Sequence, residues 1–464
     1  MRIEKDFLGS VQVPDDAYWG VFTKRANENF SLSGMKAKPV LIKAYGIVKK
    51  SAAEANFKLG LLEERKANAI IAAAQEVVDG KLDAHFPLDA FQAGAGTPFN
   101  MNANEVIANR ALEMLGEKRG EYSKISPNND VNMAQSSNDV TPTAIRVATL
   151  LMHGELLENA NALAASLRKK GKEYAHVVKT GRTHLQDAVP ISVQQEFNAF
   201  ALSIENDAQE MEHAAKKLAE LGIGGTAIGT GINTHPKFAA LCVERIGNNS
   251  GLEVYAGKDL IELTSSMNAF LNYSSAMRSL AVSLVRISND LKLLSSGPKT
   301  AIGEYYLPEV EPGSSIMPGK INPSIPEAAE MCALQAIACD HAVLLACKGG
   351  QLQLNMLTPL ITYNVLFASE LLANACEMFS QKCISGIIVD EKKCHENLFG
   401  GLILATALNP YFGYNAMSDL VKEALKRGIS IREIILEKKL LSKEQVDELL
   451  SPQRLISPQE KKKL

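Results

Sequence analysis

The sequence predicts a mainly α-helical protein whose centre is a bundle of long helices, with a smaller part towards each end of the chain. Two observations indicate this fold class. Between about residues 140 and 390 the chain repeats long amphipathic runs rich in Ala, Leu, Glu and Lys, whereas strand signals are few and short. Helices of about 30 residues reach about 45 Å, and rods of that length bury their apolar faces best side by side.

We predict three parts. Residues 1–138 form a mixed, mostly helical domain, in which short helices alternate with turns rich in Gly and Asn and "SVQVPDD" is a strand signal. Residues 139–392 form the long-helix bundle, and residues 393–464 form a small helical domain. One helix of the last domain opens with the capping-box pattern Ser442-x-x-Gln445 and ends before Pro452.

The central runs predict helices over 143–175, 192–221 and 265–294 and a fourth that starts near Pro326, with a short strand at "HVVKTG" (176–181). In the second run, apolar residues recur at spacings of three and four, which places them on one helix face. These residues are Phe197, Phe200, Ile204, Ala208, Met211 and Ala215. The polar faces still carry many alanines and isolated apolar residues, which suit packing against other copies of the chain.

Composition excludes several classes of protein. The chain has 49 Lys and Arg against 52 Asp and Glu, and it has no basic block that could hold a nucleic-acid backbone. The start, "MRIEKDFLGS", carries charges where a signal peptide is apolar, and no segment reaches about 18 uncharged apolar residues. Seven scattered cysteines without CxxC spacing indicate reduced thiols. We therefore expect a soluble, cytoplasmic protein with no nucleic-acid or membrane partner and no metal site.

Four polar segments interrupt the helical runs. They are "GAGTPFNMNANE" (94–105), "NNDVNMAQSSNDVTPT" (128–143), "TGRTHLQDAVP" (180–190) and the stretch 295–323. Loops longer than about 15 residues are uncommon in compact domains unless they are functional or disordered, and the aromatic content of the last stretch favours a partly ordered lid. The segments supply hydroxyls, amides and a few cationic groups, an inventory that fits a small anion such as a dicarboxylate.

Each segment also has a structural interpretation. The residues "SSND" (136–139) could be the N-cap of the helix that follows, because such side chains satisfy free amide donors there. Thr183 and His184 could simply form a turn, and Ser324-x-x-Glu327 fits a capping box.

Two nucleotide-binding patterns are only superficially present. "GSSIMPGKIN" (313–322) has five residues between its glycines and Ile321 after its lysine, whereas a P-loop has four residues there and a Ser or Thr after the lysine. "GIGGTAIGTG" (222–231) contains GxGxxA but follows a helical run, so it is not a dinucleotide fingerprint.

Several blocks together resemble a known family. "GSSIMPGKINP" resembles the signature loop of the fumarase/aspartase superfamily, and "SSND", "GRTHLQDAVP" and "GTAIGTGINTHP" resemble its other blocks in the expected order. The resemblance runs from "RIEKDFLG" to "SIREIILEKKLL". It implies a three-domain, mainly α fold whose central long-helix bundle assembles into a tetrameric helical core.

Within the superfamily the sequence resembles the aspartase branch at "GAGT" (94–97), "NPSIPE" (322–327) and "GQLQLN" (350–355). Ser137 and "TALNPYFGY" do not favour the aspartase branch, because they also resemble fumarases. The resemblance implies reversible elimination of ammonia from L-aspartate to give fumarate, through a serine base and an enediolate, without a cofactor. A class II fumarate hydratase is the alternative, and a catalytically silent helical scaffold is a remote one.

The resemblance also implies the site residues. Ser314 is the base, carried by a closing loop; Lys320 and loop amides stabilise its alkoxide, and Glu327 orients His184. Asn138 faces the leaving amino group. The groups that would bind the substrate are Thr97, Ser136, Ser137, Asn138, Thr183, Ser315, Lys320 and Asn322.

In this family each site combines three sets of residues from three subunits, so the resemblance implies a homotetramer with four composite sites. "PNNDVN" (127–132) corresponds to a secondary dicarboxylate site of fumarases but lacks the histidine found there, which puts a second site in doubt.

Overall fold

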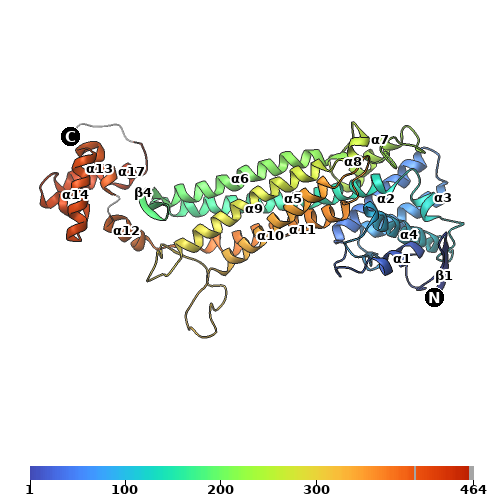
Figure 1. The fold of residues 1–464 in the computed structure, drawn as a ribbon, viewed down its shortest axis with the longest axis horizontal. Coiled ribbons are helices and arrows are strands. Elements are labelled where there is room, and N and C mark those ends of the chain that lie inside the picture. Colours follow the sequence, from blue (N-terminus) through green and yellow to red (C-terminus); the bar gives the residue numbers. More distant parts are fainter. Residues whose placement is uncertain (402–403, 459–464) are drawn as a thin grey trace. The chain divides into compact units, whose positions relative to one another are not determined.

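The computed structural model describes residues 1–401 and 404–458, and the predicted mainly α class is confirmed (Figure 1). Within these residues the strands form small two-stranded sheets that connect or flank the helices. The chain folds as two compact units. The first comprises 1–158, 207–281 and 332–374, and the second comprises 159–206, 282–331 and 375–464. The division at 1–138, 139–392 and 393–464 stays a prediction.

The first part of the chain begins with the antiparallel strands β1 (Arg2–Asp6) and β2 (Gly9–Val13). The strand signal "SVQVPDD" corresponds to β2, whereas β1 was not predicted. Four helices follow: α1 (Val21–Asn29), α2 (Pro39–Lys58), α3 (Glu64–Val78) and α4 (Thr97–Met114). Single helical turns lie at Asp83–His85, Gly94–Gly96 and Pro127–Val131. Helix α2 starts with a proline, whose fixed φ suits the first helical position.

Five long helices carry the centre of the chain, and four of them are the predicted ones. They are α5 (Ser137–Glu173), α6 (Val193–Leu218), α9 (Asn268–Leu294), α10 (Ser324–Lys348) and α11 (Thr358–Lys382). Each contributes a stretch to both compact units. The six apolar residues predicted on one face of α6 are all at most 5% exposed, so the 3.6-residue period identified the buried face correctly.

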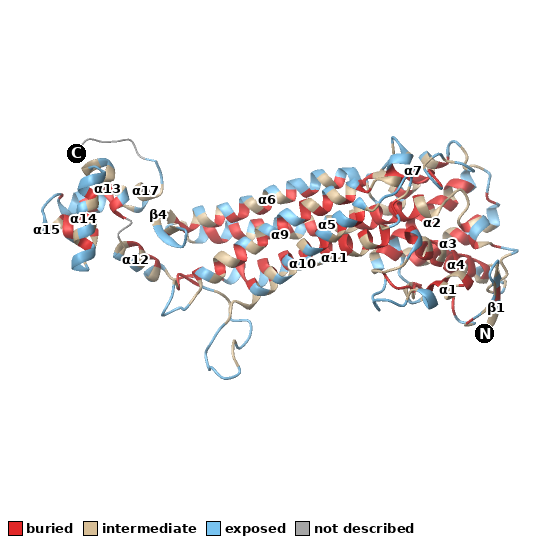
Figure 2. Cartoon of the chain, viewed as in Figure 1, coloured by how far each residue is buried: buried red, intermediate tan, exposed pale blue. Residues whose placement is uncertain are grey.

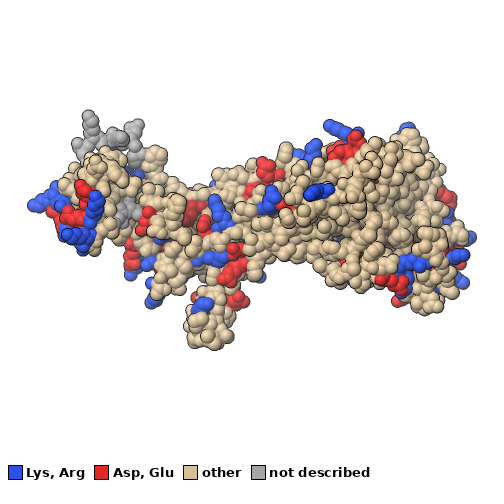
Figure 3. All heavy atoms as spheres, in the orientation of Figure 1, with Lys and Arg blue, Asp and Glu red and all other residues tan. Residues whose placement is uncertain are grey.

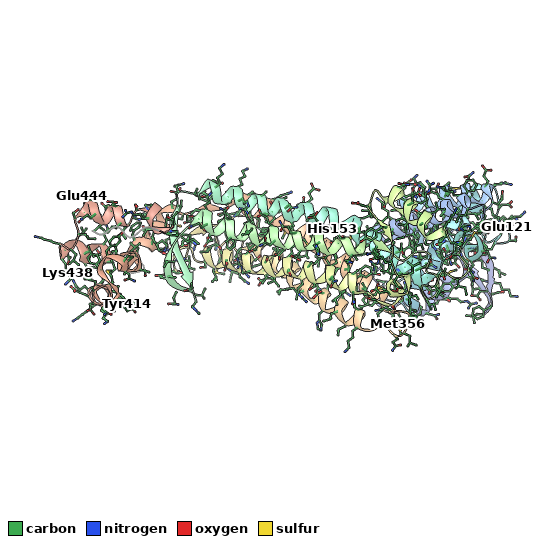
Figure 4. The ribbon with its side chains drawn as sticks, turned by 90° about the horizontal axis from the view of Figure 1, so that it is seen from above. Glu121, His153, Met356, Tyr414, Lys438 and Glu444 are labelled. Atoms are coloured by element: carbon green, nitrogen blue, oxygen red, sulfur yellow. The ribbon has the colours of Figure 1, made fainter. Side chains whose placement is uncertain are left out.

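Polar contacts within each unit show which helices are neighbours. In the first unit, His153 of α5, which is labelled in Figure 4, has its Nδ1 3.1 Å from the Tyr273 hydroxyl of α9. Ser274 of α9 donates to Asp340 of α10 at 2.7 Å. In the second unit, Arg168 of α5 pairs with Glu205 of α6. Buried residues line the facing sides of these helices in Figure 2, as expected for a bundle.

Short elements connect the long helices. They are β3 (Val178–Thr183), β4 (Gln186–Ser192), β5 (Glu220–Leu221), α7 (Phe238–Ser250), β6 (Tyr255–Ala256), α8 (Leu260–Ser265), β7 (Tyr305–Tyr306) and β8 (Ile388–Val389). The strand predicted at 176–181 corresponds to β3, which pairs with β4 as a hairpin.

The last part of the chain is a set of short helices with its own apolar core. These are α12 (Glu391–Gly400), α13 (Leu404–Phe412), α14 (Tyr414–Arg427), α15 (Ile431–Glu437), α16 (Lys443–Leu449) and α17 (Pro452–Leu455). The capping box at Ser442 and Gln445 is present as predicted. Charged side chains of both signs lie together here (Figure 3); Arg427, for example, pairs with Glu423 and Glu437.

Helix α10 is unusually apolar on its outer side. Among the described helices it alone is long and apolar enough to cross a membrane by length and composition, a test that the core helix of a soluble protein also passes. Only one third of its most apolar window is buried within this chain. Its exposed side carries Met331 (65% exposed), Leu334 (51%) and Leu345 (52%), at the spacing of one helix face.

Candidate active site

The first two polar segments lie against each other in the first unit. Gly94, Ala95 and Gly96 all have φ between 53° and 82°, a left-handed turn that leads directly into α4. A Cβ on Gly96 would lie 2.8 Å from Thr141 Oγ1, so only glycine allows this turn to pack on the start of α5. The turn therefore places the residue before Thr97 against the start of α5. The Thr97 hydroxyl donates to Gly94 O at 2.6 Å.

The N-cap interpretation of "SSND" is correct for Ser136. Its Oγ accepts a hydrogen bond from the Asn138 amide at 3.2 Å, and the Asp139 carboxylate accepts one from the Ser136 amide at 2.9 Å. Capping uses the lone pairs of the Ser136 oxygen and leaves its hydroxyl hydrogen for another acceptor. A cap and a substrate donor are thus compatible at this residue.

Asn138 and Asp139 hold the glycine-rich segment 222–231 against the start of α5. Asn138 Nδ2 donates to Ala227 O at 2.7 Å, which leaves its Oδ1 as the acceptor that an ammonium group requires. The buried Asp139 accepts hydrogen bonds from the Gly224 and Thr226 amides at 3.0 and 2.9 Å. Burial raises the pKa of Asp139 to about 6, although these amides and the charge of Lys49 act in the other direction.

Thr183 and His184 lie at the tip of the β3–β4 hairpin in the second unit. Thr183 pairs with Gln186, so His184 and Leu185 are the two turn residues, with φ of 56° and 60°. Two-residue hairpin turns favour Asn or Gly at such angles, and side chains held there indicate a functional constraint. The turn interpretation is therefore correct, and it also exposes the imidazole.

Two buried ion pairs anchor this hairpin to the long 295–323 segment. Glu304, fully buried, accepts hydrogen bonds from Arg182 at 2.7 and 3.1 Å and pairs with Lys179 at 3.1 Å. Burial alone would raise the pKa of Glu304, but the Arg182 hydrogen bonds and the Lys179 charge hold it below its usual value. Arg182 directly precedes Thr183, so Glu304 connects the hairpin tip to the 295–323 segment.

The loop 313–322 is closed at its neck by backbone and amide bonds. Gly313 N donates to Lys320 O at 2.8 Å, and Asn322 Nδ2 donates to Gly313 O at 2.7 Å. A Cβ on Gly313 would lie 2.8 Å from Asn322 N, so the neck requires glycine.

Inside this loop Ser314 occupies a small nest of amides. Its Oγ accepts hydrogen bonds from the Ile316 and Met317 backbone N–H groups at 3.2 and 3.1 Å. Donors aimed at a hydroxyl oxygen favour its ionised form. Ser315 and Lys320 are exposed on the same loop.

The predicted residues are divided between the two compact units. Thr97 and residues 136–138 lie in the first unit, and Thr183, His184, residues 314–322 and Glu327 lie in the second. In the part of the chain that the structure describes, no ion pair or hydrogen bond joins His184 to Glu327, which is exposed in the first turn of α10. The same described residues contain no group of three or more His, Cys, Asp and Glu side chains placed to hold a metal ion.

Sequence reasoning missed the buried residues behind these groups, chiefly Lys49, Asn100, Asp139 and Glu304. Asp139 could have been found, because an acid three residues after Ser136 is the position that reaches back to an N-cap amide. The other three had no local signal.

Comparisons with known proteins identify the family of the chain. Residues 9–338 match the lyase family and residues 404–457 match the fumarase C C-terminal family. The chain is 48% identical to an aspartate ammonia-lyase of Pseudomonas aeruginosa over 98% of this chain and 97% of that protein. It is 42% identical to a class II fumarate hydratase of Bradyrhizobium diazoefficiens over 98% and 97%.

Among solved structures, a fumarate lyase:delta crystallin from Brucella melitensis, bound to cobalt, superposes with a TM-score of 0.96 at 46% identity. The similarity covers 98% of this chain and 100% of that one. The family match over most of the chain, the full-length relatives and the helical fold agree: the chain belongs to the fumarase/aspartase superfamily of lyases.

Proposed function

We propose that this protein is an aspartate ammonia-lyase, which eliminates ammonia from L-aspartate to give fumarate and catalyses the reverse addition. The observation that carries the proposal is the Ser314 hydroxyl, held by two backbone amides. It lies on a loop whose sequence resembles the signature loop of the superfamily. The aspartate ammonia-lyase relative at 48% identity over nearly the whole chain supports the choice of substrate.

The chemical problem is the weak acidity of the proton on the carbon beside the β-carboxylate. Ser314, as the alkoxide, takes this proton, and the β-carboxylate becomes an enediolate that carries additional negative charge. The enediolate then collapses, the C–N bond of the substrate ammonium group breaks with its electron pair on nitrogen, and neutral ammonia leaves. The proton taken by Ser314 passes to water, which restores the alkoxide. Donors aimed at the developing charge stabilise the transition state more than the substrate, typically by about 3 kcal/mol for one well-placed group.

The other site residues take the roles that the resemblance implies. Ser136, Ser137 and Ser315 donate to substrate carboxylate oxygens, and Asn138 accepts from the amino group. Thr97 also donates to the substrate, by turning its hydroxyl hydrogen away from Gly94 O. Thr183, His184, Lys320 and Asn322 bind the α-carboxylate, with Glu327 orienting His184. Lys320 adds positive charge near the Ser314 alkoxide.

We also propose a homotetramer with four composite sites. The support is the exposed apolar side of α10, because contiguous apolar surface that one chain leaves uncovered marks an interface. The two groups of site residues lie in different compact units, as expected if each site is completed by other copies. In this assembly Glu327 of one copy orients His184 of another.

The reduced state of the cysteines supports a soluble, cytoplasmic protein. All seven are free thiols, and burial raises the pKa of Cys376 and Cys383 to about 12, which keeps them protonated and unreactive. The proposal needs no cofactor, nucleic acid or membrane.

The test supplies purified protein with L-aspartate or with L-malate and follows fumarate by ultraviolet absorbance. Fumarate from aspartate is expected, whereas turnover of malate alone identifies a fumarate hydratase, the function of the Bradyrhizobium relative. Activity on neither substrate identifies a silent scaffold.

The base is tested with Ser314→Ala, which should lower kcat by about 10²- to 10⁴-fold. Ser296→Ala is the matched control, because Ser296 lies in the same 295–323 segment and its hydroxyl only caps α9 by donating to Leu293 O. Full activity of a folded, tetrameric Ser314→Ala enzyme would exclude Ser314 as the base.

A further inference from the structure

Lys49, in the middle of α2, is a buried cation that the reaction described above does not use. Its side chain is fully buried, and its Nζ donates to Asn132 Oδ1 and Gln135 Oε1, each at 2.8 Å. Within residues 1–401 and 404–458 no carboxylate forms an ion pair with it. A buried charge normally needs such a partner, so the position of Lys49 requires another explanation.

The ammonium group imposes a direction on the hydrogen bonds around it, because it has donors and no acceptor. It therefore turns Oδ1 of Asn132 towards itself, and Asn132 Nδ2 donates to Gln135 O at 3.2 Å on the other side. Asn132 Oδ1 accepts a second hydrogen bond from Asn100 Nδ2 at 3.3 Å. The orientation of Asn132 thereby requires Asn100 to present its amino group.

The same amino group reaches the proposed substrate site. Asn100 Nδ2 also donates to Ser137 Oγ at 3.0 Å. A hydroxyl that accepts from Asn100 keeps its own hydrogen for another group. If Asn100 were turned over, its Oδ1 would face Ser137 and take that hydrogen, and it would also meet Asn132 Oδ1 oxygen to oxygen.

We propose that Lys49 is a positioning residue that acts through Asn132 and Asn100 to keep the Ser137 hydroxyl a hydrogen-bond donor towards the substrate carboxylate. This inference rests on the proposed function, because Ser137 matters only if it binds the substrate. Asn100 comes from α4, Asn132 follows the turn 127–131 and Ser137 opens α5, so three elements depend on one cation.

The electrostatic surroundings support this role. The titratable groups that act on Lys49 are Asp139 of α5 and Cys242 of α7, and burial lowers the pKa of Lys49 to about 7 against their attraction. The neutral amine has a lone pair and no longer imposes a direction on Asn132. Substrate binding should therefore weaken as pH rises through this value.

The test compares Lys49→Met with Lys50→Met, which makes the same chemical change one residue along α2. Lys50 donates to Gln75 of α3 and to no site residue. Lys49→Met should raise KM for L-aspartate about tenfold, more than it lowers kcat, and should remove the rise in KM above about pH 7. Lys50→Met should change neither.

A double-mutant cycle with Ser137→Ala separates positioning from a general effect on the fold. If Lys49 acts through Ser137, Lys49→Met should change KM less than about twofold in the Ser137→Ala enzyme. An equal effect of Lys49→Met in both backgrounds would overturn the inference. Asn100→Ala, measured in the same cycle, replaces Lys49→Met if that variant does not fold.

The inference and the proposed function fail differently. No fumarate from L-aspartate with the wild-type enzyme refutes the proposed function. A wild-type enzyme that is active on aspartate, with a Ser137→Ala enzyme of raised KM in which Lys49→Met has the same effect as in the wild-type background, refutes the role of Lys49 alone.

Discussion

Arg182 and Glu304 form a two-point ion pair across the second unit, with Nη2 to Oε1 at 2.7 Å and Nη1 to Oε2 at 3.1 Å. Lys179 and Asn397 complete the hydrogen bonding of the same carboxylate. Because Glu304 is fully buried, removing its charge leaves cations without a full set of partners.

We predict that Glu304→Gln lowers the free energy of unfolding by about 3 kcal/mol, the cost of breaking a buried pair. Activity should fall with it, because the hairpin that carries Thr183 and His184 loses its anchor. Glu205→Gln is the matched control, since it breaks the more exposed pair with Arg168 and should have a much smaller effect. Denaturant unfolding measures both; equal losses would contradict the prediction.

The stability of the protein should depend on pH through Lys49. Its pKa is about 7 in the folded chain against an ordinary value of 10.5, so between these values the unfolded chain binds more protons. The contribution of Lys49 therefore rises with pH from about 7 to about 10.5, and it is lost as pH falls through about 7. Unfolding midpoints measured across this window should rise less steeply for Lys49→Met than for wild type, whereas Lys50→Met should follow wild type.

Gly313→Ala should disable the signature loop without unfolding the protein. The new Cβ would meet Asn322 N and the Lys320 carbonyl, so the neck must open. A displacement of about 1 Å at a reacting group can cost about 100-fold in rate, and we expect a loss of kcat/KM of that order. The control is Gly154→Ala, where the added Cβ meets nothing within 4 Å. An active Gly313→Ala enzyme would show that the neck is dispensable.

The outer side of α10 should hold the assembly together. Leu334→Glu places a charge on this side and should dissociate the proposed tetramer, with loss of activity because each site of that assembly would be composite. Leu425→Glu, which changes an even more exposed leucine of α14, should do neither. Size-exclusion chromatography with light scattering measures the mass. A Leu334→Glu protein that stays tetrameric would place the interface elsewhere.

The sequence predicted those features that depend on neighbours along the chain. The period of the run from Phe197 to Ala215 identified both α6 and its buried face, and the pattern at Ser442 identified a helix start. The same holds for Ser136, where local capping and the site motif coincide. Each of these features depends on residues that lie only two to four positions apart in the sequence.

Contacts between distant segments could not be read in this way. A lysine such as Lys49 is expected on the surface, and only the approach of Asn132, 83 residues later, explains why it is buried. Glu304 is likewise an ordinary acid of a polar segment until Arg182, 122 residues earlier, reaches it. Apolar periodicity shows which face of a helix is buried, whereas a charged residue in the sequence does not show which distant residue it pairs with.

The bonds between Gly313, Lys320 and Asn322 mean that residues 313–322 are already a folded lobe before any ligand arrives. We expect such a lobe to move as a rigid body about its two stems. The conformational entropy of ordering the lobe would then be lost once, when the protein folds, and closure over a substrate would order only the stems.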